Sequence, residues 1–179
     1  MNFRRQVPLL IALLANGILW LLVMELNHVL AIWSLAVMLP VAFVLFAGLN
    51  LQYWPGFFVA ILSGLMQDAV LPISHGYFIL VLPVIHLVIH LLRGKLHKTG
   101  GLDSVILAQS LNLSAILLLG ILFSYRTEVD WIRNLPRFLV EVLLSQLFLL
   151  VGGGYFLELQ RKLTAMLGVE FPDKEAQPG

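Results

Sequence analysis

Residues 7–24 read VPLLIALLANGILWLLVM, a run of about 18 residues without a charged side chain. A helix that crosses a bilayer needs about 20 mostly apolar residues, so this run has close to the required length. The strands of membrane β-barrels are shorter and alternate apolar with polar residues, which LLIALL at 9–14 does not do. The run therefore predicts a membrane-spanning α-helix.

The composition of the whole chain agrees with that prediction. Of its 179 residues, 60% are hydrophobic and 12% are charged, whereas soluble domains have about 45–50% apolar and about 25% charged residues. The chain has no cysteine, which excludes disulfides, thiolate nucleophiles and cysteine metal sites. Because the first apolar run is longer than the core of a cleavable signal, we expect an uncleaved first helix.

Apolar runs separated by short polar clusters predict an all-α polytopic membrane protein, a compact bundle of six helices. The expected spans are residues 7–24, 29–49, 53–71, 76–92, 104–125 and 136–157. Residues 159–168 have apolar side chains at helical spacing and predict a short amphipathic cytoplasmic helix that ends at Gly168. This helix either lies on the inner leaflet or docks a partner. Residues 169–179 are expected to form a disordered tail.

The distribution of Lys and Arg predicts the orientation of the bundle. With six crossings and a cytoplasmic N-terminus, eight basic residues are cytoplasmic and three are outside, as the positive-inside rule requires. Both termini are therefore expected in the cytoplasm. The cytoplasmic residues are Arg4, Arg5, Arg93, Lys95, Lys98, Arg161, Lys162 and Lys174; the outer ones are Arg126, Arg133 and Arg137.

Small residues recur at every fourth position of the third expected span, at Gly56, Ala60 and Gly64, and Asp68 continues the series. Such a stripe lets a neighbouring helix approach closely, so we expect it to be a helix-packing or partner-contact face. A charged side chain at the centre of a span costs about 2.5–3.5 kcal/mol. Asp68 is therefore expected either to face protein or to cap the chain before Pro72.

The sixth expected span has a second candidate contact face. Glu141, Ser145 and Gly152 share one side of a helix there, and we expect them to pack against another helix. Glu141 also follows Arg137 by four residues, which predicts an interfacial ion pair of small value.

His86 and His90 are four residues apart, hence on one face of the fourth span. Two histidines at this spacing are weak candidates for metal ligands, because a site needs a third ligand and none is close in sequence. We expect neutral imidazoles that form hydrogen bonds between helices, with no metal and no cofactor. Pro83 and Pro40 are expected to kink the fourth and second spans.

The sequence contains no nucleophile elbow, no phosphate-binding loop and no His-Glu-x-x-His motif. Asp68 and Glu141 are the only acids well inside the expected spans, and nothing supports a shared catalytic site for them. A basic surface for nucleic acid is also lacking. We therefore expect a protein that is not an enzyme and does not bind nucleic acid.

The stretch GFFVAILSGLMQD at 56–68 and the following turn LPISHG at 71–76 resemble the family of the rod-shape-determining membrane protein MreD. In that family the third helix ends in Gly-x-x-x-Asp, and another glycine begins the next helix. Gly64, Asp68 and Gly76 occupy those positions here. One departure is AIWS at 31–34, where the family pattern leads us to expect a proline.

An expected function is implied by the resemblance alone. The resemblance implies a non-catalytic scaffold in the bacterial inner membrane that belongs to the cell elongation complex and is involved in cell shape and peptidoglycan synthesis. The implied partners are the periplasmic coiled-coil protein MreC, cytoplasmic MreB filaments and the wall synthases, RodA and a penicillin-binding protein. The resemblance also implies that the lipid bilayer is in contact with this assembly.

An alternative is the vitamin-type substrate-binding membrane subunit of an energy-coupling-factor importer, which is also a compact six-helix bundle. Such a subunit would have Ala-x-x-x-Ala on its first helix, whereas Ala12 and Ala15 are three residues apart. It would also need polar groups that converge on an outer pocket. The candidates for that pocket are Asp68, Glu141 and Gln146.

Overall fold

The computed structural model describes residues 3–69, 76–99, 101–127 and 131–168. Within these ranges the chain is helical and has no strand, so the predicted all-α class is confirmed for the described part. The elements are α1 (Phe3–Leu30), η1 (Ala31–Trp33), α2 (Ala42–Asn50), α3 (Tyr53–Asp68), α4 (Tyr77–Thr99), α5 (Gly101–Thr127) and α6 (Trp131–Met166).

Among the described residues, four helical stretches are long and apolar enough to cross a membrane: Gln6–Trp33, Tyr77–Gly94, Asp103–Tyr125 and Asn134–Met166. Large apolar side chains of α1, α4, α5 and α6 point outward, including Leu14, Leu80, Ile121 and Leu143. Conversely, polar side chains such as Asn16 are among the most deeply buried. An apolar exterior around a partly polar interior is compatible with a membrane protein and opposite to the usual pattern in water.

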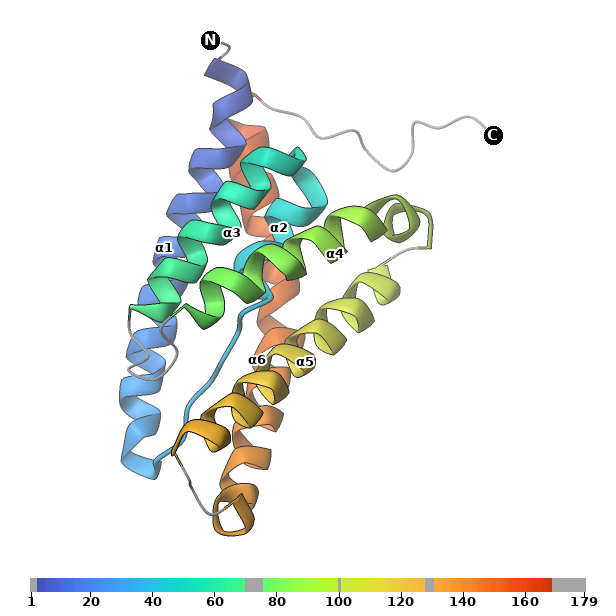
Figure 1. Ribbon diagram of the computed structural model, residues 1–179. Helices are drawn as coiled ribbons and strands as arrows, with labels where there is room; N and C mark the ends of the chain where they lie inside the picture. Colours follow the sequence, from blue (N-terminus) through green and yellow to red (C-terminus); the bar gives the residue numbers. More distant parts are fainter. Residues whose placement is uncertain (1–2, 70–75, 100, 128–130, 169–179) are drawn as a thin grey trace.

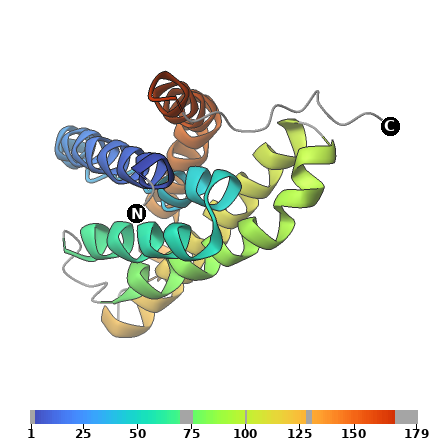
Figure 2. The same cartoon turned by 90° about the horizontal axis from the view of Figure 1, so that it is seen from above.

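In Figure 1, α1 and α6 run along the long direction of the molecule, whereas α4 crosses it obliquely. The beginning of α1 and the end of α6 lie at the same end of the molecule, shown uppermost, and the beginning of α6 lies at the other. Seen from above, α2 is near the middle, with α1, α3, α4 and α6 around it (Figure 2). All its residues from Ala42 to Leu49 are buried.

The expectation of one continuous helix over residues 29–49 is wrong. The first helix continues to Leu30, η1 follows, and residues 35–39 are not helical. Ser34 has a left-handed backbone conformation with φ of 58°, which ends the helical path. Pro40 then disfavours helical geometry in Leu39, the residue before it, and a turn at residues 40–41 leads into α2. Pro40 therefore lies between a non-helical segment and α2 instead of kinking a continuous helix.

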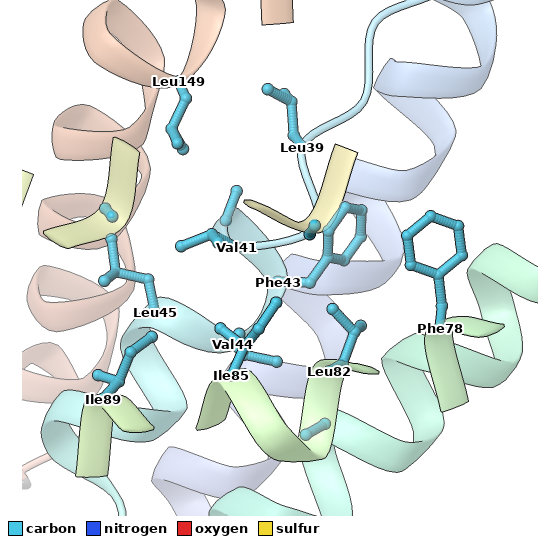
Figure 3. Packing of buried hydrophobic residues seen from close by; sticks show 14 of the residues in the cluster. Leu39, Val41, Phe43, Val44, Leu45, Phe78, Leu82, Ile85, Ile89 and Leu149 are labelled. Atoms are coloured by element: carbon cyan, nitrogen blue, oxygen red, sulfur yellow. The ribbon is translucent and has the colours of Figure 1, made fainter. Parts of the chain in front are cut away.

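The apolar core is organised by α2 and α4. Val44 from α2 and Leu82, Ile85 and Ile89 from α4 are buried in one cluster, which Leu149 of α6 also joins. Figure 3 shows these side chains between the two helices. Because α2 is only 9 residues long, its helical conformation depends on packing in this cluster rather than on intrinsic helix stability.

The separate amphipathic helix expected at 159–168 is instead the end of α6, which continues without a break to Met166. Gly168 follows with a positive φ of 77°, in the expected place for a helix end. The remaining predicted boundaries shift by a few residues, and the expected third span ends at Asp68 as α3. The predicted tail at 169–179 lies outside the described residues.

Candidate functional site

Gly64, Asp68 and Gly76, which carry the family resemblance, together build the junction between α3 and α4. The carboxylate of Asp68 accepts hydrogen bonds from the backbone N–H groups of Phe78, at 3.0 Å, and Ile79, at 2.9 Å. These groups belong to the first turn of α4 and have no partner within their own helix. Asp68 therefore caps α4 from the end of α3, and its negative charge also favours that position at the helix N-terminus.

Gly64 lies directly against the backbone that Asp68 caps. A Cβ atom at Gly64 would be 2.6 Å from the carbonyl oxygen of Phe78 and 2.7 Å from the Cα of Ile79. Gly76 precedes α4 with φ of 86°, a conformation that residues with a side chain rarely adopt. Each glycine thus meets a geometric requirement, one for close approach and one for the turn into α4.

The close contact between α3 and α4 extends along the small-residue face. A Cβ at Gly56 would be 2.9 Å from the His86 Nε2 atom, and Ala60 is fully buried. The face expected from Gly56, Ala60 and Gly64 therefore lies against another helix of this chain. Gly48 of α2 makes a similar contact that the sequence reading missed, since its Cβ would be 2.6 Å from Ile89 Cγ2.

Side chains from three helices bind the non-helical residues 37–41. Asn27 of α1 accepts from the Val37 N–H at 2.7 Å and donates to the Val37 carbonyl at 3.0 Å. Ser145 of α6 accepts from the Met38 N–H at 2.9 Å. Asn112 of α5 bridges the Val41 N–H and the Met38 carbonyl, each at 3.4 Å. These contacts replace the hydrogen bonds that a helix would have provided.

A second polar cluster is buried where α1, α2, α3 and α6 meet. The Asn16 amide donates to the carbonyl of Phe43 at 2.6 Å and to the Ser63 hydroxyl at 2.8 Å. Its oxygen lies 3.5 Å from Gln160 Nε2, and Thr164 Oγ1 donates to the Gln160 carbonyl at 2.7 Å. The sequence reading missed this cluster because its members come from distant parts of the chain.

Two polar side chains at the end of α6, Gln160 and Thr164, point inward and are buried, whereas Leu159, Leu163 and Met166 are exposed. Lys162 on the same helix is also exposed. Helical periodicity places Gln160 and Thr164 on one face, but it does not say which face meets the protein. In a hydrocarbon environment the apolar face is the outer one.

His86 and His90 lie beside the connection between α2 and α3. The Nε2 atom of His86 is 3.3 Å from the carbonyl oxygen of Tyr53. Because a carbonyl oxygen only accepts, the His86 Nε2 atom carries the proton of this hydrogen bond to α3. Arg93 donates to the Leu51 carbonyl at 3.0 Å. His86 and Arg93 thus bind backbone carbonyls at the break between α2 and α3, whereas the ring of His90 packs against that of Tyr53 and its buried Nδ1 atom has no hydrogen-bond partner among the described residues.

The other expected contacts of α6 are divided among different partners. Glu141 pairs with Arg137 at 3.1 Å on its own helix, while Ser145 is buried and binds the Met38 N–H. Gly152 is exposed and packs against no other helix among the described residues, because a Cβ there would meet nothing within 4 Å. A face pattern alone cannot show where a tilted helix leaves its neighbours.

The three candidates for a converging outer pocket also have separate contacts. Asp68 caps α4, and Glu141 pairs with Arg137. Gln146 and Gln109 donate to each other's backbone carbonyls, both at 3.2 Å, and so join α6 to α5.

The contacts at these positions are hydrogen bonds, a helix cap and the ion pair between Arg137 and Glu141. No group of three or more metal-ligating side chains occurs among the residues that the structure describes. Comparison of the chain with known protein families, with curated proteins and with solved structures found no match.

Proposed function

We propose that this chain is a multi-pass protein of the bacterial inner membrane that crosses the bilayer six times, with both termini in the cytoplasm. The four long apolar helices supply four passes. Residues 35–41 and α2 together form the second pass, and α3 forms the third. Non-helical backbone is tolerated inside a bilayer only where protein satisfies its polar groups. The bonds from Asn27, Asn112 and Ser145 support this arrangement.

The proposed orientation is supported by the charges at the two ends. Arg93 and Arg161 lie in the last two turns of α4 and α6, whereas Arg137 is near the start of α6. Arg137 and Glu158 are 21 positions apart on one helix, which corresponds to about 30 Å and to the thickness of the hydrocarbon layer. The stretch between these residues, in which Glu141 pairs with Arg137 at the outer end, would then cross the layer.

Within that membrane the chain acts as a non-catalytic scaffold of the cell elongation complex, as the resemblance to the MreD family implies. It would hold an MreC-like periplasmic coiled-coil protein and connect cytoplasmic MreB filaments to the wall synthases. One observation supports this proposal most: Gly64, Asp68 and Gly76, which carry the resemblance, form a single helix junction. Their packing role suits a rigid platform for other membrane proteins.

Recovery of the complex from membranes tests the scaffold. The tagged chain is extracted in mild detergent, and we expect a single-span protein with a periplasmic coiled coil to copurify with it. Gly64→Leu should abolish that recovery, because the side chain would separate α3 from α4. Gly94→Leu is the matched control, since a Cβ there meets nothing within 4 Å. Normal recovery with Gly64→Leu, or no such partner with the unmodified chain, would refute the proposal.

The same preparation distinguishes the importer alternative. A vitamin-like small molecule released by denaturing the purified chain would favour that function over the scaffold. No contact among the described residues specifically favours the importer, because Asp68, Glu141 and Gln146 already have other partners.

A further inference from the structure

Three consecutive glycines, residues 152–154, lie in the middle of the 36-residue helix α6. Close packing does not explain them. A Cβ at Gly152 or Gly154 would meet nothing within 4 Å, and one at Gly153 would meet only the side chain of Leu149 on the same helix. Each glycine weakens a helix by about 0.5–1 kcal/mol relative to alanine. The helix is therefore weakest at a position where its packing does not require small residues.

The glycines separate two parts of α6 that are held in different ways. Before them, Val142 and Leu149 are buried apolar side chains, and Gln146 exchanges two hydrogen bonds with Gln109 of α5. After them, in residues 155–166, the fully buried side chains are both polar: Gln160 and Thr164. The apolar Leu157 of this segment is only partly buried where it packs against the core. A segment that buries less apolar surface separates locally more readily.

The polar contacts of this second part with the rest of the bundle are long. Gln160 Nε2 is 3.5 Å from Asn16 Oδ1, and Arg161 Nε is 3.3 Å from Asn50 Oδ1. Favourable N–H···O distances are about 2.9 Å. In addition, Gln160 Oε1 is buried and has no hydrogen-bond partner among the described residues. A buried polar atom without a partner costs about 1–3 kcal/mol, which reduces the net stabilisation of the closed position.

We propose that α6 has a hinge at residues 152–154 and that residues 155–166 form an arm that swings away from α1 and α2. The contact of Gln160 with Asn16, here called the latch, holds the arm in its closed position. The hinge is independent of the proposed partner proteins, because it depends only on contacts within the chain. Opening the arm would remove the contact of Gln160 with Asn16, whose amide also donates to the Ser63 hydroxyl.

Distances between spin labels in lipid nanodiscs test the hinge directly, since the chain has no native cysteine. The arm pair is Leu91→Cys with Met166→Cys, and the reference pair is Leu91→Cys with Leu143→Cys; all three positions are exposed. We expect two distance populations for the arm pair and one for the reference pair. A single arm-pair population as narrow as the reference would overturn the hinge.

Substitutions at the hinge and the latch test the mechanism. Gly152→Ala with Gly154→Ala should leave only the closed arm population, because both methyl groups fit the open space and favour the helix. Gln160→Ala should increase the open population. Gly17→Ala on α1 is the control, because its Cβ makes an ordinary 3.9 Å contact, and it should change neither pair. An unchanged open population in the double-alanine variant would contradict the proposal.

Discussion

The carboxylate of Asp68, at the end of α3, accepts a hydrogen bond of 2.9 Å from the backbone N–H of Ile79 in the first turn of α4. An acidic side chain inside a membrane protein is usually considered first as part of an ion pathway. Here its oxygens complete the hydrogen bonding of a helix N-terminus. The acid and the two glycines nearby therefore have one common structural purpose, which is to fix α4 against α3.

Removal of the Asp68 carboxylate should destabilise this junction. We expect Asp68→Ala to lower the free energy of unfolding by about 1–2 kcal/mol, the typical cost of a lost helix cap. Asp68→Asn should have a smaller effect because one acceptor oxygen remains. Thermal unfolding in detergent measures both, with the exposed Glu25→Ala as control. Equal unfolding temperatures for Asp68→Ala and the control would contradict the capping role.

Gly64 should tolerate even one added methyl group poorly. Gly64→Ala would place a Cβ 2.6 Å from the Phe78 carbonyl oxygen, and such overpacking typically costs about 1–3 kcal/mol. Gly94→Ala should be neutral or slightly stabilising, because its Cβ would point into open space. If the two variants unfold at the same temperature, α3 and α4 are not as close as described.

Asn27 should be essential for the non-helical second pass. Asn27→Leu leaves both the N–H and the carbonyl of Val37 without the partner they have now. Each buried polar group that loses its partner costs about 1–3 kcal/mol. We expect much of the folded protein to be lost on size-exclusion chromatography. Ser114→Ala, which removes an exposed hydroxyl bonded within its own helix, should behave like the unmodified chain.

His86 should be replaceable by an apolar residue. His86→Leu removes one hydrogen bond, to the Tyr53 carbonyl, for which we expect a cost of about 0.5–1.5 kcal/mol. Complex recovery should persist, and added zinc should change neither recovery nor unfolding temperature. Loss of the complex that zinc restores would instead show a metal role for this histidine.

The sequence predicts the long helices well because a bilayer imposes a simple length and polarity requirement. The four apolar helices that contain Leu14, Leu80, Ile121 and Leu143 correspond to expected spans. The importance of Gly64 and Asp68 could also be anticipated from their helical spacing. What the spacing could not specify was the partner of Asp68, because that partner is the backbone of a later helix.

The non-helical residues 35–39 could not be anticipated from hydropathy, since the run at 29–49 is apolar except for Ser34. Their conformation depends on bonds from Asn27, Asn112 and Ser145, which are brought together only in the folded chain. The inward orientation of Gln160 has a similar cause. Periodicity identifies two faces of a helix, and the surrounding bundle decides which face is buried.

The proposed six-pass arrangement with both termini in the cytoplasm is tested most directly by labelling single cysteines in intact cells. We expect a membrane-impermeant maleimide to label Ser34→Cys and Tyr125→Cys from the periplasm. Gly94→Cys and Gly168→Cys should be labelled only after the membrane is permeabilised. Labelling of Gly168→Cys in intact cells, or recovery of the chain in solution without detergent, would contradict this arrangement.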